Sequence, residues 1–115
     1  MATNNFKRKF STNIGTTATA VGGYQVLLDV QTTAIGLSLA NVSASQVTAT
    51  VTLNTQAGDT VHIIKDAPIP SGGALIPIGG DMKVVMEHND QIKVTSDTAS
   101  SIDAILDILE INTST

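Results

Sequence analysis

Residues 47–53 alternate strictly between apolar and polar side chains, and this run constrains the fold more than any other stretch. Its apolar positions are Val47, Ala49, Val51 and Leu53, and a threonine lies between each neighbouring pair. Successive side chains of a β-strand point to opposite faces, so a period of two predicts a strand with one buried face. The β-branched valines and threonines favour the same assignment.

A second alternating run lies just before the first. Ile35, Leu37 and Leu39 share one face there, and a mainly polar connection, residues 41–45, joins the two runs. We expect the two strands to pair as a hairpin or to bridge two sheets. Further strands, separated by turn residues, are expected at 24–30, 60–65, 74–78, 82–88 and 91–96. Two prolines make residues 66–73 an extended edge segment.

The last strongly apolar segment, residues 101–111, fits two patterns. Its apolar residues recur at the spacing of one helical stripe, and they also fill one face of a strand. The isoleucine content and the surrounding strands favour the strand. As a strand, the segment is apolar on both faces except at Asp103 and Asp107. Such a strand suits a buried position or a contact between subunits.

Together these segments predict an all-β protein, an antiparallel β-sandwich of seven or eight strands with a jelly-roll or immunoglobulin-like topology. The 115 residues suffice for one domain with a modest core. Two Phe, one Tyr and no Trp leave that core to Val, Ile, Leu and Ala. The absence of cysteine excludes disulfides and cysteine-ligated zinc, and it fits a protein that assembles in a reducing cytosol.

The first part of the chain differs chemically from the rest. Residues 1–28 carry a net charge of +3, because no acid precedes Asp29, whereas residues 29–115 carry −7. The first residues also show little pattern for burial against themselves. We therefore divide the chain into an extended N-terminal arm, 1–23, and a β-sandwich domain, 24–115. The arm is expected to be dispensable for folding.

A short run in this arm is the candidate assembly site: Phe6, Lys7, Arg8, Lys9 and Phe10. Aromatic side chains dominate the binding energy of protein interfaces, so the two phenylalanines are expected to anchor the arm on a neighbouring subunit. The basic residues are expected to face acidic surface of that subunit. A frayed terminus or a first edge strand of the domain is the structural alternative. Nucleic acid is not an expected partner, because three charges on an acidic protein make a weak electrostatic footprint.

No motif indicates catalysis, a cofactor or a bound metal. The two histidines, His62 and His88, could share a metal with Glu87 or Asp90, but they lie far apart in sequence and one adjoins a turn. The Gly-Gly pairs are interpreted as turn residues. They do not indicate a phosphate-binding loop, because no Gly-Lys-Ser/Thr follows them. We expect no catalytic residue, cofactor, metal or small-molecule substrate. No membrane partner is expected either, because no apolar run approaches the roughly 20 residues of a membrane span.

Five stretches of the chain resemble those of a known class of proteins. They are residues 7–17 (KRKFSTNIGTT), 35–41 (IGLSLAN), 65–73 (KDAPIPSGG), 83–86 (KVVM) and 109–111 (LEI). With them the chain resembles small virion structural proteins of tailed bacteriophages, particularly phages of marine bacteria and cyanobacteria. The similarity extends over nearly all of the chain and consists of strand and turn residues. One departure is Asn89-Asp90, where similar proteins commonly have Gly-Asp.

The resemblance implies a non-enzymatic structural protein of the virion. A capsid decoration (cement) subunit is the leading assignment, and a neck, tail or baseplate accessory protein is the alternative. It implies a homo-oligomer, a trimer or a ring, that contacts other virion proteins and is assembled in the cytoplasm of the bacterial host. A carbohydrate- or cell-surface-binding β-sandwich is a further alternative. Against it, residues 25–115 lack the aromatic side chains on which sugars usually stack.

Overall fold

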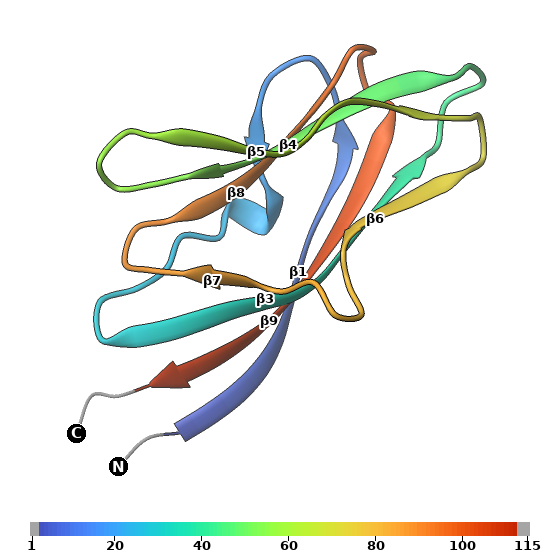
Figure 1. Cartoon of the computed structure of the whole chain (residues 1–115). Helices are drawn as coiled ribbons and strands as arrows, with labels where there is room; N and C mark the ends of the chain where they lie inside the picture. The colour runs from blue at the N-terminus through green and yellow to red at the C-terminus, as the bar shows by residue number, and fades with distance from the viewer. Residues whose placement is uncertain (1–2, 113–115) are drawn as a thin grey trace.

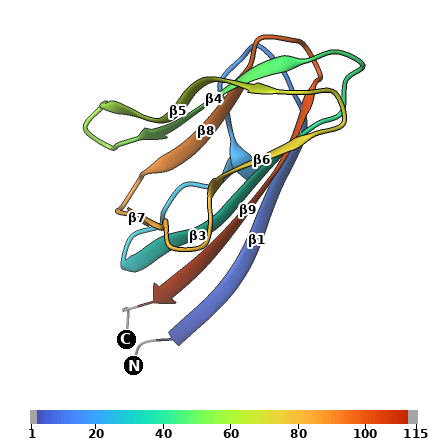
Figure 2. The same cartoon turned by 45° about the vertical axis from the view of Figure 1, so that its right-hand side comes forward.

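The computed structural model describes residues 3–112, which form an antiparallel β-sandwich (Figure 1). The first sheet has the order β1 (Thr3–Ile14), β9 (Ile102–Asn112), β3 (Val30–Asn41) and β6 (Ala74–Ile78), and β7 (Val84–Met86) also pairs with β3. The second sheet has the order β2 (Thr19–Ala20), β8 (Gln91–Ser96), β4 (Val47–Asn54) and β5 (Thr60–Ile69). Figure 2 shows β1, β9 and β3 side by side in one layer and β8, β4 and β5 in the other.

The strand pairing is that of a jelly roll. β1 pairs with β9, β2 with β8, β3 with β6 and β4 with β5, all antiparallel. A long antiparallel ribbon wound across two sheets produces this nested pairing, and an immunoglobulin-like sandwich does not. The 3-10 turn η1 (Val21–Gly23) lies between β2 and β3. No helix within residues 3–112 is long and apolar enough to cross a membrane.

The core is aliphatic, as the composition predicts. In β4 the predicted inward residues Val47, Ala49 and Val51 are buried, and in β8 the predicted pair Ile92 and Val94 is buried as well. Each fully buried valine or isoleucine side chain among them stabilises the fold by about 1.5–3 kcal/mol. The strand prediction for residues 101–111 is confirmed by β9, whose even-numbered positions from Ile102 to Glu110 all face the interior.

The alternation in β3 changes phase at a β-bulge. Ile35 is an extra residue in β3 opposite β9, and the register shifts there. Leu37 and Leu39 are buried as predicted, but Ile35 lies off their face and is only partly buried. Because of the bulge, Ala34 on the other side of Ile35 also faces the interior. β3 and β4 lie in different sheets, so their connection bridges the sandwich.

Residues 24–29 are a loop, although the sequence predicts a strand at 24–30. The backbone N–H of Val26 donates to the carbonyl oxygen of Asp90 at 3.2 Å, and the N–H of Asn89 donates to the carbonyl of Val26 at 2.9 Å. The segment is thus fastened to the turn between β7 and β8 instead of to a sheet. Asp29 has φ 61°, a turn conformation that ends the loop before β3.

Residues 3–14, within the predicted arm, form the edge strand β1. Its pairing with β9 runs without interruption from Thr3 opposite Asn112 to Ser11 opposite Ala104, and after a register shift it continues with Ile14 opposite Ile102. The predicted boundary between residues 23 and 24 therefore does not separate two parts of the fold. The physical reason is that β1 gains backbone hydrogen bonds to β9 and buries few of its own side chains, so its sequence shows no apolar period. Residues 1–2 of the arm and 113–115 of the domain lie outside the described part of the chain.

Candidate assembly face

β1 sends its side chains alternately to the two sides of the first sheet, and this divides the predicted assembly run. Lys7 and Lys9 lie opposite the buried residues Ile108 and Leu106, so they point to the inner side. Phe6, Arg8 and Phe10 point to the outer side, away from the second sheet. The five residues therefore do not form one site.

The inner side chains of β1 join a polar cluster. The Lys7 ammonium lies 2.8 Å from Oε1 of Glu110, a carboxylate that is almost fully buried. The Tyr24 hydroxyl donates to Oε2 of Glu110 at 2.6 Å, and it lies 2.8 Å from the Thr32 hydroxyl. The Lys9 ammonium lies 5.7 Å from the centre of the Tyr24 ring, within cation–π range. Two of the three basic residues thus hold β1 on its own domain.

The charge of Glu110 is compensated inside the fold. Burial by itself raises the pKa of the Glu110 carboxyl, but hydrogen bonds from Lys7 and Tyr24 and the charges of Lys7 and Lys9 outweigh it. The pKa of Glu110 is therefore below its ordinary value of 4.5. Burial raises the pKa of the Tyr24 hydroxyl, and its bond to Glu110 raises it further. At neutral pH the carboxyl is ionised and the phenol is not.

We expect this carboxylate to contribute to acid lability. Because its folded pKa lies below the ordinary value of 4.5, it stabilises the fold above that pH, and the stabilisation is lost as the pH falls through the folded pKa. Glu110→Gln should lower the melting temperature at neutral pH and flatten its decline below about pH 5. Thermal melts across the acidic range measure this, with Asp81→Asn as the exposed control. Equal declines in wild type and Glu110→Gln would contradict the assignment.

The outer sides of β1 and β9 form an exposed stripe that we call the assembly face. It consists of three cross-strand pairs: Phe6 with Leu109, Arg8 with Asp107, and Phe10 with Ile105. Phe6 is 75% exposed, Phe10 57% and Ile105 44%. Exposed apolar side chains that gather in one place usually mark an interaction surface. The two phenylalanines, which the sequence singles out, are thus brought together with residues of β9.

The assembly face continues across the first sheet onto β7. Val85, which is 73% exposed, lies opposite Thr33, and Thr33 lies opposite Leu109 on the other side of β3. Beside Phe10 the surface is hollowed by a shallow depression of about 320 Å³. From the two apolar faces of β9, the sequence predicts that this strand is buried or contacts another subunit. The alternation of residues 82–88 gives no sign that the outward Val85 belongs to the same exposed surface.

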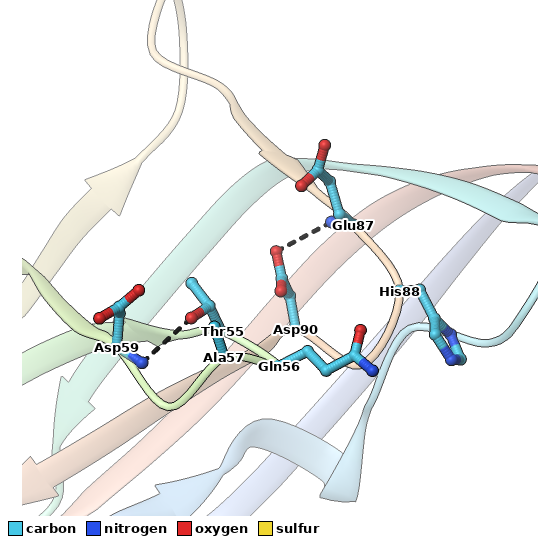
Figure 3. A pocket seen from close by; sticks show the side chains of 7 residues that line it. All are labelled: Thr55, Gln56, Ala57, Asp59, Glu87, His88 and Asp90. Atoms are coloured by element: carbon cyan, nitrogen blue, oxygen red, sulfur yellow. Dashed lines mark hydrogen bonds between the residues drawn. The ribbon is translucent and has the colours of Figure 1, made fainter.

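A larger depression lies at one end of the sandwich, between the β4–β5 turn and the β7–β8 turn (Figure 3). It measures about 710 Å³. Two of its polar side chains serve the turns themselves: Oδ2 of Asp90 accepts from the Glu87 N–H at 2.9 Å, and the Thr55 hydroxyl accepts from the Asp59 N–H at 3.1 Å. Nδ1 of His88, which also lines the depression, is buried and has no hydrogen-bond partner within the described residues. Within residues 3–112 no three His, Asp or Glu side chains are grouped to hold a metal ion. The depression shows no convergent chemistry.

No protein-family model matches this chain, and no curated protein matches it. Among solved structures, the chain is similar to one from Bacillus endospore appendages, which are described as a novel family of disulfide-linked pili. The two share 11% sequence identity with a TM-score of 0.58, over 98% of this chain and 89% of that one. At this identity the similarity is one of fold alone, and it agrees with the antiparallel sandwich.

Proposed function

We propose that the protein is a non-enzymatic structural subunit of a bacteriophage virion. A capsid decoration subunit is the leading role, and a neck, tail or baseplate accessory protein is the alternative. The assembly part of the proposal is carried by one observation, the apolar stripe of Phe6, Phe10, Ile105 and Leu109 on the outer side of the first sheet. The virion part is supported by the resemblance of the sequence to small phage structural proteins.

The form of the surface favours a protein partner. Exposed aromatic side chains on a sheet face pack well on another apolar surface, and aromatic residues are enriched among interface hot spots. β1 is also the edge strand of its sheet, and residues 3–11 pair regularly with β9 without a bulge. An edge of this kind is where another chain can add backbone hydrogen bonds.

The pilus neighbour gives general support to an assembling subunit. The structure similar to this chain comes from endospore appendages that are pili, so a chain with a similar fold does build a polymer. Those pili are disulfide-linked, whereas this chain has no cysteine. Its contacts would therefore hold without disulfides, and a virion lattice strengthens non-covalent contacts by repeating them. The proposed partners are copies of the same chain and other virion proteins.

Removing the two exposed rings is expected to abolish incorporation while leaving the fold intact. Phe6→Ser with Phe10→Ser deletes most of the exposed aromatic area but little buried area, so the melting temperature should change only slightly. The double variant is supplied to the phage or prophage that encodes the gene, and purified particles are quantified by mass spectrometry. The matched control is Leu27→Ser with Val61→Ser, two other exposed apolar residues.

Two results would contradict different parts of this proposal. Absence of the wild-type protein from purified particles would overturn the virion assignment. Incorporation of the Phe6/Phe10 variant at the wild-type level would remove the role of the assembly face and leave the virion assignment in place.

A further inference from the structure

We propose that the assembly face packs on the same face of a second copy of this chain. The two copies are related by a two-fold axis that lies in the interface and runs parallel to the strands, between β1 and β9. This inference rests on the proposed function, because it names the partner of the assembly face. A two-fold contact joins only two copies. The trimer or ring implied by the resemblance would therefore need a second, different contact surface.

The argument starts from two opposite charges at the centre of the assembly face. Arg8 and Asp107 are directly opposite each other in the β1–β9 register, and both are exposed. Within residues 3–112 neither side chain makes a hydrogen bond or an ion pair. The Asp107 carboxylate instead lies over Gly36 of β3, the neighbouring strand, with Oδ2 3.4 Å from the point where a Cβ would stand. A cation and an anion thus remain available to a partner.

Apolar pairs flank these charges symmetrically. Phe6 and Leu109 form the row on one side, and Phe10 and Ile105 form the row on the other. Residues two positions apart on a strand are separated by roughly 7 Å, so each apolar row lies one side-chain layer from the charges. On contact with another face, the rows would exclude water around the central charges.

The charge pattern selects one of two ways to place a two-fold axis in the interface. An axis parallel to the strands lays β1 of one copy over β9 of the other and keeps each row in place. Arg8 of each copy then meets Asp107 of the other copy, so this contact occurs twice. Phe6 and Phe10 of each copy meet Leu109 and Ile105 of the other. An axis perpendicular to the strands would lay Arg8 on Arg8 and Asp107 on Asp107, which like-charge repulsion opposes.

The selected arrangement agrees with known packing and symmetry. Two sheets that pack face to face keep their strands within about 30° of one another, at a separation of about 10 Å. A two-fold contact is isologous, so the same patch serves both copies and every pair occurs twice. The two Arg8–Asp107 contacts would fix the register, while the apolar rows supply most of the affinity.

The test uses two charge reversals, each made alone and then mixed. Arg8→Asp gives two Asp–Asp contacts in its own dimer, and Asp107→Arg gives two Arg–Arg contacts, so each variant alone should associate about tenfold or more weakly than wild type. In an equimolar mixture, every contact again joins an aspartate to an arginine. Sedimentation velocity and native mass spectrometry should therefore show a mixed dimer that contains one copy of each variant.

Controls separate the pairing from general charge effects and from misfolding. Lys65→Asp and Asp81→Arg make the same charge changes at exposed positions outside the assembly face, and both should associate like wild type. Thermal melts verify that each variant is folded. Should either reversal fail to fold, the milder pair Arg8→Glu and Asp107→Lys replaces it.

Three results would overturn the two-fold contact. They are wild-type association of either single variant, a mixture that stays monomeric, and a wild-type protein that is monomeric at every concentration. In all three cases, the proposed function would still be supported if the Phe6/Phe10 variant failed to enter particles. The partner of the assembly face would then be a different virion protein. Restoration as a closed particle of two copies supports the two-fold contact specifically, because a head-to-tail contact restored by mixing would continue beyond two copies. A contact with a foreign partner would not be restored by mixing.

Discussion

Val51→Asp is expected to abolish folding of this domain. Val51 lies in β4, between β8 and β5, and its side chain is completely buried. The substitution places an unpaired carboxylate in an aliphatic layer and removes two methyl groups from it. Its cost is several kcal/mol, which is comparable with the roughly 5–15 kcal/mol that stabilise a whole domain. Expression in the soluble fraction and a thermal melt by circular dichroism measure the effect.

The adjacent residue gives a matched control for this substitution. Thr52 points to the opposite side of β4, where it lies between Lys93 of β8 and His62 of β5 in the register. Asp at this position faces a cation and can still accept the hydrogen bond that the Asn54 side chain donates to Thr52. Thr52→Asp should therefore melt close to wild type. Similar melting of Val51→Asp and Thr52→Asp would contradict the buried register of β4.

Deleting residues 1–12 is expected to destabilise the domain by about 3 kcal/mol or more. The deletion removes all of the pairing of β9 with β1 except Ile14 opposite Ile102, and it leaves the buried Glu110 without Lys7. Breaking a buried ion pair costs roughly 3–5 kcal/mol, but Lys7 is 46% exposed, so that contribution is smaller here. The lost backbone hydrogen bonds, at about 1 kcal/mol each, add to it and are partly offset by regained chain entropy.

This expected result is the opposite of the one that the sequence alone predicts, namely an arm dispensable for folding. Urea denaturation of the deletion variant distinguishes the two. Lys7→Met serves as the companion variant, because it keeps the backbone of β1 and removes only the ion pair. A deletion variant with the wild-type midpoint would mean that β1 rests on the domain without stabilising it.

Local alternation is sufficient to predict the strands whose one face is buried. β8 matches the predicted residues 91–96, and the inward side chains of β4 are those that the period of two selects. The prediction of β3 is only half right, because a bulge at Ile35 shifts the alternation in a way that periodicity cannot show. The sequence leaves β1 open as an alternative, a first edge strand of the domain, and for another reason does not single it out. Its inner side chains are polar, and its partner β9 lies at the other end of the chain.

The candidate site could be predicted in part. Phe6 and Phe10 stand out in a chain with three aromatic residues, and they are exposed on one face. The sequence alone does not show which basic residues point inward and which point outward, because the direction of each side chain follows from the pairing of β1 with β9. Lys7 meets its partner Glu110 only across that pairing, so the two residues are more than a hundred positions apart in the chain.

The nested pairing of the jelly roll also bears on synthesis and folding. Among the described strands, β1 leaves the ribosome before the others and its partner β9 leaves it after them, so the first sheet cannot close until the whole of this domain has been made. Closing so long a loop delays folding, and domains dominated by such distant contacts commonly fold in milliseconds to seconds. A surface composed of β1 and β9 exists only after residues 102–112 have been made. Prematurely terminated chains would therefore lack it, and particles built through that surface would exclude them.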